Sequence, residues 1–304
     1  MNKIEHIRTL SEFHRTRRLE PPAHPLISVV DYAKVDILPE LRERSWRFDF
    51  YFISLKRNLC GKIKYGQQSY DFDEGVMFFI GPGQVFRIDR EPNPLLERSG
   101  WMLLIHPDFF WNTALANAIK RYGYFEYAIN EALFVSQKEE QTLEAILENI
   151  RSEYQGNLDA YSQQIIISQI ETLLNYCERF YNRQFLTRKK TSHQVLEKLE
   201  RLLTEYFNQD DLIHKGLPTV GYLAEQLHLS PKYLSSLLRS VTGLSAQQHI
   251  HQQVIERAKV QLSKPELSIA EIAYGLGFGH PQSFSKFFKR ETQSSPLAFR
   301  RAFN

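Results

Sequence analysis

Two consecutive segments decide how the last third of this 304-residue chain folds: IAEIAYGLGF at residues 269–278 and QSFSKFFKR at residues 282–290. Ile272, Ala273 and Leu276 have the spacing of the first helix of a helix-turn-helix motif. In that motif a small residue lets the two helices approach each other, and apolar residues fill the space between them. The phenylalanines of the second segment supply the inward face of the second helix, so the two segments together predict one helix-turn-helix.

The same pattern occurs a second time, earlier in the chain, in residues 223–245. Equivalent residues are 49 positions apart before the turn (Ala224 and Ala273) and 50 positions apart after it (Arg239 and Lys289), because the second turn is one residue longer. A single copy could reflect ordinary packing of two helices. Two copies in a fixed register favour an all-α domain with two helix-turn-helix motifs.

A helix is expected at residues 246–263, between the two copies. A helix of that length spans about 27 Å at 1.5 Å per residue. Successive major grooves on one face of a DNA duplex are about 34 Å apart. One chain could therefore place a helix in each of two adjacent grooves, and a spacer shorter than the groove repeat would favour bent DNA.

These residues resemble the signature of the AraC/XylS family of bacterial transcription regulators, and the resemblance continues through the segment SPLAFR at residues 295–300. It covers the last third of the chain directly, and the order of a β-rich domain, a helical pair and a double helix-turn-helix resembles the full-length architecture of that family. The resemblance implies sequence-specific binding to double-stranded promoter DNA, usually with activation of transcription through contact with RNA polymerase.

The inward residues of each second helix determine which side chains remain free to reach DNA. In the first copy Leu234, Leu237 and Leu238 must face inward, and in the second copy the phenylalanines do so. The outward residues, which are the expected DNA-binding residues, are Lys232, Ser235, Ser236 and Arg239 in the first copy and Gln282, Ser283, Ser285, Lys286, Lys289 and Arg290 in the second. The alternative for each of them is an ordinary solvated helix surface.

The outward residues differ in the contacts that their chemistry permits. Gln282 can pair with adenine and Lys286 with guanine in the major groove, whereas Lys289, Arg290 and Arg239 are suited to phosphates. The serines of the first copy have short side chains that reach base edges poorly. The second copy is therefore expected to contribute more base recognition than the first.

Two positions depart from the usual pattern of the family. Gln293 stands where the first copy has Gly243, at a helix end where the left-handed conformation favours glycine. It is expected either to cost about 1 kcal/mol there or to end the helix differently. His228 occupies the turn position that Gly277 fills in the second copy, and we expect a tolerated turn residue there rather than a pH or metal sensor.

The region from residue 25 to residue 110 is rich in Val, Ile, Phe and Tyr in short runs that Gly, Pro, Asn and Asp separate. This pattern is typical of antiparallel strands and their turns. Strands are expected at residues 26–32, 48–57, 62–65, 69–72, 76–80, 85–88 and 101–105, with a turn at the sequence GPG of residues 81–83. Such a series predicts a small barrel or sandwich.

Between residues 136 and 185 the apolar residues recur at helical spacing. The first helix is expected to start at a capping box formed by Ser136 and Glu139, and its apolar face runs from Leu143 to Ile150. A second apolar face runs from Ile165 to Phe180. These faces could pack on the β-domain of their own chain, but we expect one of them to pair with a second chain in a homodimer. The polar segment RKKTS at residues 188–192 is expected to be a linker.

The segment GVMFFIGPGQVF at residues 75–86 is similar to the cupin-like sensor half of the same family. Enzymatic cupins bind a metal near such a turn through clustered histidines, but Phe86 stands where the turn would supply one. We therefore expect no metal, no cofactor and no enzymatic activity. The aromatic side chains could instead hold a small effector or simply fill the core. The expected pocket residues are Phe50, Phe52, Phe78, Phe86 and Trp101.

Charge is unevenly distributed along the chain. The net charge of +3 belongs to the last third, which has 13 basic and 10 acidic residues from Thr191 onward, while the preceding residues have 25 of each. From Ser283 to the end, five basic residues face only Glu291. The positive charge therefore concentrates around the second expected DNA-reading helix, as a nucleic-acid contact requires.

The sequence as a whole predicts an α+β protein in three parts: a cupin-like β-barrel sensor domain at residues 1–135, helical dimerisation elements and a linker at 136–190, and a double helix-turn-helix domain at 191–304. Two isolated cysteines, no signal peptide and no apolar run of membrane-spanning length favour a cytoplasmic location. The predicted function is a transcription regulator, an activator that responds to a small-molecule effector. The alternatives are a cupin-type enzyme and a ligand-independent regulator whose β-domain mediates protein contacts.

Overall fold

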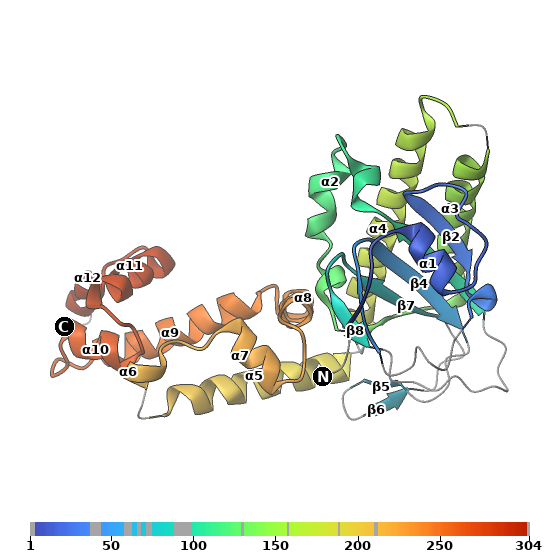
Figure 1. The fold of residues 1–304 in the computed structure, drawn as a ribbon. Coiled ribbons are helices and arrows are strands. Elements are labelled where there is room, and N and C mark those ends of the chain that lie inside the picture. The colour runs from blue at the N-terminus through green and yellow to red at the C-terminus, as the bar shows by residue number, and fades with distance from the viewer. Residues whose placement is uncertain are drawn as a thin grey trace. The chain divides into compact units, whose positions relative to one another are not determined.

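The computed structural model describes residues 4–36, 44–57, 63–65, 68–70, 75–87, 99–128, 131–156, 158–187, 189–209 and 212–302. The chain divides into two compact units, Met1–Gln184 and Phe185–Asn304, which we call unit 1 and unit 2. Unit 1 combines sheets with helices, and the described part of unit 2 is helical (Figure 1). The expected mixed α+β fold with a helical C-terminal part is therefore confirmed.

Unit 1 contains a five-stranded antiparallel sheet and a three-stranded sheet. The larger sheet has the order β10 (Leu133–Val135), β7 (Gly75–Ile80), β4 (Tyr51–Arg57), β9 (Ser99–Ile105) and β2 (Ile27–Asp31). The smaller sheet has the order β1 (Ile4–Ile7), β3 (Ser45–Phe48) and β8 (Val85–Arg87), with β1 parallel to β3. The short strands β5 (Ile63–Tyr65) and β6 (Gln68–Tyr70) pair with each other.

Each of the seven expected strands overlaps an observed strand, although residues 62, 71, 72 and 88 lie outside the described residues. The expected strand at 48–57 is wrong in one respect, because the chain bends at Asp49 and Phe50 and forms two strands that belong to different sheets. Strands β1 and β10 were not expected, since they lie outside the Val- and Ile-rich region. Closure of these sheets into a cupin-like barrel stays a prediction.

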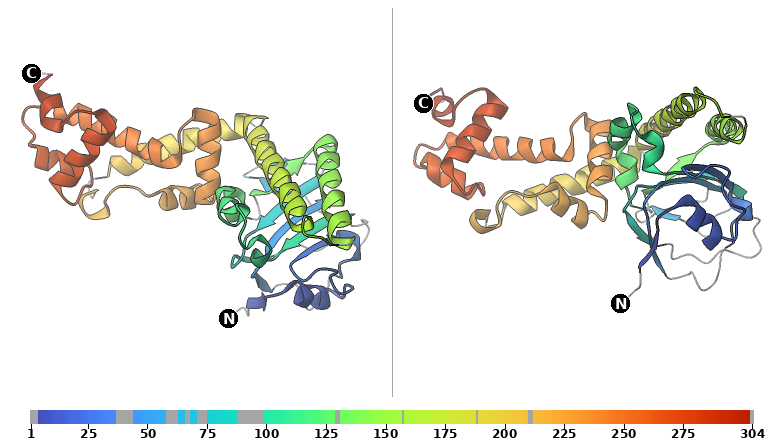
Figure 2. Two further views of the ribbon diagram at one scale, coloured as in Figure 1. Left: turned by 90° about the horizontal axis from the view of Figure 1, so that it is seen from above. Right: turned by 45° about the horizontal axis from the view of Figure 1, so that its top comes forward.

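One face of the larger sheet lies against helices α3 (Gln137–Gln155) and α4 (Ser162–Thr187) (Figure 2). The capping box of Ser136 and Glu139 at the start of α3 is confirmed. The Tyr154 hydroxyl of α3 accepts a hydrogen bond from the Val29 amide of β2 at 2.9 Å. The Gln184 side chain of α4 accepts one from the Phe134 amide of β10 at 2.8 Å. The helices are thus attached to strands at both edges of the sheet.

The apolar faces predicted on these helices are buried within unit 1, apart from the exposed Ile165 at the start of the second face. They therefore pack inside their own chain, which was the other possibility for them. Cys177 lies on this buried side of α4, and burial raises the pKa of its thiol. That environment makes the thiol inert, while Cys60 lies outside the described residues.

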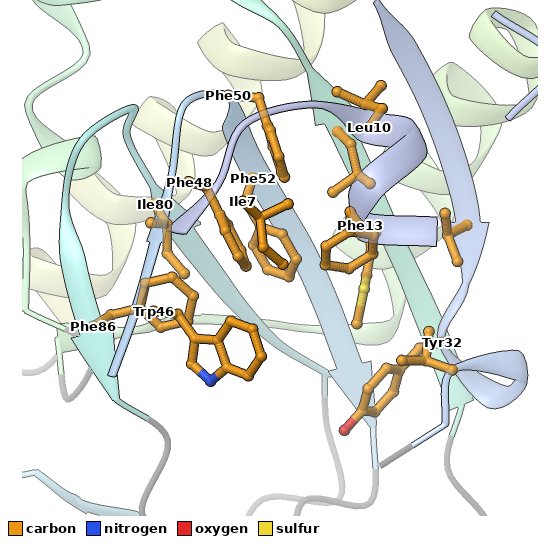
Figure 3. Close-up of a cluster of buried hydrophobic side chains, with 14 residues drawn as sticks. Ile7, Leu10, Phe13, Tyr32, Trp46, Phe48, Phe50, Phe52, Ile80 and Phe86 are labelled. Atoms are coloured by element: carbon orange, nitrogen blue, oxygen red, sulfur yellow. The ribbon is translucent and has the colours of Figure 1, made fainter. Parts of the chain in front are cut away.

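The opposite face of the larger sheet carries a cluster of 14 buried apolar and aromatic residues, shown in Figure 3. Helix α1 (Leu10–Thr16) contributes Phe13, whose ring meets the rings of Phe48 and Phe50 edge-on at 5.8 and 6.0 Å. Phe48 and Phe50 stack on each other at 4.9 Å. Burying one such side chain stabilises a protein by about 1.5–3 kcal/mol, so this cluster is a major source of the stability of unit 1.

Unit 2 begins within the last turn of α4 and continues through eight helices in the described residues. They are α5 (Lys189–Phe207), α6 (Leu212–Lys215), α7 (Val220–Gln226), α8 (Pro231–Thr242), α9 (Ala246–Leu262), α10 (Ile269–Gly275), α11 (Pro281–Thr292) and α12 (Pro296–Arg301). The sequence predicts seven helices in this region, at residues 193–207, 220–227, 231–240, 246–263, 269–276, 281–291 and 296–303. Each of them overlaps an observed helix, with ends that differ by a few residues. The four-residue helix α6 was not expected, because one turn is too short for an apolar period to show.

The expected linker at residues 188–192 is wrong for the residues that the structure describes. Residues 189–192 form the first turn of α5, so the polar segment is helical rather than extended. Ser192 is buried, and its hydroxyl donates a hydrogen bond to the Phe185 carbonyl at 2.9 Å. Lysine is a good helix former, which is why a run without apolar residues could still join a helix.

We expect Gly100→Ala to destabilise unit 1 strongly. Gly100 has a φ of +122°, and a Cβ there would lie 2.1 Å from the Leu55 carbonyl oxygen of the neighbouring strand. Relieving that overlap must shift β9 or β4, at a cost of about 2–4 kcal/mol. All three tryptophans of the chain lie in unit 1, so tryptophan fluorescence during urea unfolding measures the effect on this unit.

Gly81→Ala is the matched control, because a Cβ at Gly81 would lie at an ordinary 3.4 Å from the Phe125 carbonyl oxygen. It should change the free energy of unfolding by less than about 1 kcal/mol. Equal losses of stability in the two variants would contradict the proposed overlap at Gly100.

Candidate nucleic-acid interface

The two helix-turn-helix pairs of unit 2, α7–α8 and α10–α11, have the same internal hydrogen bonds. In each copy the amide five residues after the small alanine donates to the alanine carbonyl. Leu229 donates to Ala224 at 2.9 Å, and Phe278 donates to Ala273 at 2.9 Å. The residues that the sequence aligns between the two copies therefore also form equivalent backbone hydrogen bonds.

The two second helices end in the same way. Thr242 and Thr292 each donate a hydrogen bond from the hydroxyl to the carbonyl four residues earlier, at 2.8 Å in both copies. The next residue is left-handed in both, with φ +79° at Gly243 and φ +61° at Gln293. Of the two outcomes expected for Gln293, the first is observed. The second helix ends in the same left-handed conformation as the first, and the glutamine adopts that conformation at a cost of about 1 kcal/mol.

The turns of the two copies differ in the space around one backbone position. His228 in the first turn and Gly277 in the second both have positive φ, at +56° and +89°. A Cβ at Gly277 would lie 2.9 Å from the Gly216 carbonyl carbon and 3.2 Å from the Leu212 carbonyl oxygen. Histidine is tolerated in the first turn because it only adopts a less common backbone conformation. The second turn also needs the absence of a side chain.

Helix α8 presents the residues that the sequence assigned to its outer face. Leu234, Leu237 and Leu238 are buried as expected. Lys232 and Arg239 are exposed, and the short side chains of Ser235 and Ser236 are half-buried beside them. The outer face of α8 therefore carries a positive charge at each end and only short side chains between the two charges.

Tyr233 of α8 is a buried residue that the sequence reasoning missed. Its ring packs edge-on against Phe185 at 5.1 Å, and burial raises the pKa of its hydroxyl well above the usual value. The signal was present, because Tyr233 precedes Leu237 by one helical turn and so extends the same apolar face. Tyr233 anchors the start of α8 to the first turn of unit 2.

Helix α11 presents a longer and more basic surface than α8. Phe284, Phe287 and Phe288 are buried as expected. Of the six predicted contact residues, Ser285 is half-buried and the other five are exposed: Gln282, Ser283, Lys286, Lys289 and Arg290. The structure therefore brings all six to one outer face.

The basic residues of α11 differ in their own contacts. Arg290 binds the adjacent Glu291, with Nη2 to Oε1 at 2.7 Å. Lys286 and Lys289 form no ion pair with any residue that the structure describes. The two lysines are therefore better placed than Arg290 to meet a phosphate or a base.

Helix α9 contacts both copies and holds them together. His249 near its start bonds to the Thr242 hydroxyl of α8 at 2.9 Å. His251 packs edge-on against Phe287 of α11 at 5.0 Å, and its Nδ1 lies 3.2 Å from a Glu291 oxygen. Figure 1 shows α8 at one end of α9 and the group α10–α12 toward the other.

Two arginines tie α9 to further helices of unit 2. Arg257 of α9 donates from Nη1 to the Phe207 carbonyl at the end of α5, at 3.1 Å. Arg300 of α12 donates to the Leu262 carbonyl at the end of α9, at 3.3 Å. Cations at the C-terminal ends of helices satisfy free carbonyls and oppose the helix dipole. These contacts fix α9 as a rigid element, and nothing in the apolar period of the sequence revealed them.

The expected effector residues do not all meet. Phe50, Phe52 and Phe86 belong to the buried cluster of Figure 3. Phe78 packs against a smaller group that contains Phe134. Trp101 is a correction: it pairs with Leu55, and strand alternation places that pair on the opposite face of the sheet from Phe52. Aromatic character alone does not show to which face of a sheet a side chain belongs.

Other kinds of site and segment find no support in the described part of the chain. Among the described residues, no group of three or more His, Cys, Asp or Glu side chains could hold a metal ion. A search of the same residues finds no helix with the length and apolar character needed to span a membrane.

Comparisons with known proteins agree with the geometry of unit 2. Residues 223–302 match the family model of a helix-turn-helix domain. The Msm operon regulatory protein of Streptococcus mutans is 36% identical over 110 residues, which are 35% of this chain and 40% of that protein. The chain thus spans less than half the length of that relative. Unit 2 carries an AraC-type helix-turn-helix domain.

Two further comparisons concern the whole chain and a solved structure. The arabinose operon regulatory protein of Salmonella typhimurium is 23% identical over 252 residues, which are 82% of this chain and 83% of that protein. The C-terminal domain of the response regulator yesN of Fusobacterium nucleatum is 29% identical, with a TM-score of 0.31, over 35% of this chain and 98% of that one. The two operon regulatory proteins are thus regulators by name.

We expect Gly277→Ala to destabilise the AraC-type domain and to leave unit 1 unchanged. The added Cβ meets backbone atoms of the loop after α6, so the cost should be about 2–3 kcal/mol. Circular dichroism at 222 nm should show a lower unfolding midpoint for the helical signal, while the tryptophan signal of unit 1 keeps its midpoint. His228→Ala, at the equivalent position of the first turn, should cost less than about 1 kcal/mol. Equal effects of the two substitutions would argue against the contact with Gly216.

Proposed function

We propose that this chain is a cytoplasmic, sequence-specific DNA-binding transcription regulator of the AraC type. The observation that carries the proposal is the equivalence of α8 and α11. Both helices follow a turn closed by the same alanine hydrogen bond, end at a left-handed residue and turn polar or basic side chains outward. Ordinary packing of helices has no reason to repeat an outward polar face in register.

In this proposal α11 reads bases and both helices contact phosphates. Gln282 pairs with an adenine and Lys286 with a guanine, since these are the major-groove partners that fit their side chains. Lys289 and Arg239 bind phosphates. Arg290 contributes less than the sequence suggested, because Glu291 already holds its guanidinium. The half-buried serines of α8 support positioning more than base recognition.

The length of α9 sets the form of the DNA site. Its 17 residues span about 26 Å, while the grooves on one face of straight DNA repeat every ~34 Å. We propose that α8 and α11 enter adjacent major grooves of one duplex and that the duplex bends toward the protein. The resulting site is two base-recognition segments about one helical turn apart.

Unit 1 is proposed to be the cupin-like sensing half of the regulator, with activation through contact with RNA polymerase as the mode of action. The names of the relatives support a regulator of an operon, and the β-rich fold with a buried aromatic face supports a sensing role. If unit 1 instead only mediates protein contacts, no small-molecule ligand should raise its unfolding midpoint.

Lys286→Ala should weaken binding to the DNA upstream of the protein's own gene by about tenfold or more, because a good side-chain contact to a base contributes about 1–3 kcal/mol. A gel-shift titration measures the change. Lys198→Ala is the matched control, since Lys198 is an exposed lysine of α5 outside both helix-turn-helix pairs. Both variants should keep the circular dichroism spectrum and unfolding midpoint of the parent protein. If folded Lys286→Ala binds as tightly as the parent, the assignment of α11 as the reading helix is wrong.

The homodimer remains part of the proposal, although the apolar faces of α3 and α4 are used within the chain. A dimer contact must then use exposed side chains, of which Tyr161 and Ile165 at the start of α4 are large and apolar. Sedimentation equilibrium should give about twice the 35.8 kDa of one chain, and the double variant Tyr161→Asp, Ile165→Asp should give one chain mass. Tyr274→Asp, at an exposed tyrosine of α10, is the control and should stay dimeric. A parent protein that sediments at one chain mass at micromolar concentration would exclude the dimer.

A further inference from the structure

The face of the larger sheet opposite α3 and α4, which we call the inner face, carries a buried lysine that forms no ion pair with an acidic residue among those the structure describes. Lys56 of β4 is 9% exposed. Its ammonium lies 4.9 Å from the ring centre of Tyr32 and 5.4 Å from that of Phe78. No described residue forms an ion pair or a hydrogen bond with the Lys56 side chain. A buried charge of this kind is costly, and the two ring faces offset only part of that cost.

A second buried polar group on the same face of the sheet also has no hydrogen-bond partner among the described residues. Ser54 is two residues before Lys56 on β4, so both side chains point to the same side of the sheet. Ser54 is fully buried, and its Oγ has no hydrogen-bond partner among the described residues. Its cross-strand neighbours, Phe78 and Met102, are apolar. A buried hydroxyl without a partner costs about 1–3 kcal/mol.

A second buried serine on this face, Ser28, has a hydrogen-bond partner within the chain. Ser28 of β2 is buried, and its Oγ lies 3.0 Å from Nε2 of His14. His14 in turn bonds to the Glu20 carbonyl. Ser28 is therefore satisfied within the chain, whereas Ser54 beside the lysine is not.

The local field favours a negative charge. Arg17 of the chain segment after α1 stacks its guanidinium over the Trp46 ring at 4.7 Å, and its charge acts on Lys56. Burial, with a smaller contribution from Arg17, lowers the pKa of Lys56 to about 8. Two cations thus disfavour each other in a buried region, and an anion placed there would relieve both.

The strand residues directly opposite Lys56 offer no polar group to its ammonium. On β9 the residue opposite Lys56 is Gly100, and on β7 it is Val76. Gly100 contributes no side chain beside the lysine.

We propose that unit 1 binds a small organic carboxylate on this inner face, with the carboxylate paired to the Lys56 ammonium and accepting a hydrogen bond from the Ser54 hydroxyl. The apolar part of the ligand lies against the rings of Tyr32 and Phe78. The binding site stands on unit 1 alone, and its role as the effector site of the regulator rests on the proposed function. The ligand class follows from one cation, one hydroxyl donor and aromatic walls.

The test uses the full chain and two probes of the same size, 3-phenylpropionate and its uncharged amide 3-phenylpropionamide. The acid should raise the thermal unfolding midpoint of the tryptophan signal by roughly 2 °C or more at millimolar concentration, because a ligand that binds only the folded state stabilises it. The neutral amide should leave the midpoint unchanged. Equal shifts from acid and amide, or no shift from either, would overturn the proposal.

The variants separate a binding lysine from a structural one. Lys56→Met should weaken binding of the acid by about tenfold or more without lowering the midpoint of the ligand-free protein. Ser54→Ala should weaken binding by a smaller factor, again with no loss of ligand-free stability. Lys34→Met, at an exposed lysine of the 3-10 helix η1 (Tyr32–Lys34), is the control and should bind like the parent. A Lys56→Met protein that still binds the acid, or that unfolds at a lower temperature without ligand, contradicts the proposal.

Gel shifts on the same protein samples keep this inference distinct from the proposed function. A parent protein that binds DNA but shows no acid-specific stabilisation overturns the carboxylate site and leaves the DNA-binding proposal standing. A parent protein that shows acid-specific stabilisation but binds no promoter DNA supports the site and contradicts the regulator.

Discussion

Helix α9 is the constraint on which the arrangement of unit 2 depends. It is joined to α8 through Thr242 and His249, and to α11 through His251. Arginines close both α5 and α9 with hydrogen bonds to terminal carbonyls. Two short helical subdomains of a few helices each would bury little apolar surface alone. The shared helix supplies that surface and, because an α-helix has a fixed rise per residue, also fixes the separation of the two outward faces.

Unit 1 treats the two faces of its larger sheet differently. On the face against α3 and α4, a tyrosine and a glutamine side chain form hydrogen bonds to β2 and β10, while the Trp101 Nε1 has no partner among the described residues. The other face is built from stacked aromatic rings but leaves Lys56 and Ser54 without partners among the described residues. A core that served stability alone would gain by replacing both residues with apolar ones. Unsatisfied groups at one place on an otherwise well-packed face are what a binding function requires.

The sequence was most informative where two independent patterns agreed. The register between the two helix-turn-helix copies predicted the backbone hydrogen bonds of Leu229 and Phe278, because the same spacing of small and apolar residues specifies the same local geometry. It also predicted which side chains of α8 and α11 face outward. The apolar faces of α3 and α4 were predicted as faces, but their partner was not, since an apolar stripe does not say whether it meets its own sheet or another chain.

Other features depend on contacts between residues far apart in the chain, and no local pattern carries them. Trp101 was grouped with Phe52 because both are aromatic, although strand register separates them onto opposite faces. The requirement for glycine at position 277 comes from the loop at Gly216 rather than from its own turn. The hydrogen bond from Ser192 to the Phe185 carbonyl joins the start of α5 to the preceding helix, and the polar sequence of residues 188–192 does not reveal it.

In the proposed complex, α9 holds α8 and α11 so that they enter two adjacent major grooves on one face of a bent duplex. Hydroxyl-radical footprinting of the full chain on its promoter site measures that spacing directly. The account predicts two protected segments on the same face of the DNA, about 10–10.5 base pairs apart from centre to centre. A single protected segment, or two segments on opposite faces of the duplex, would contradict it.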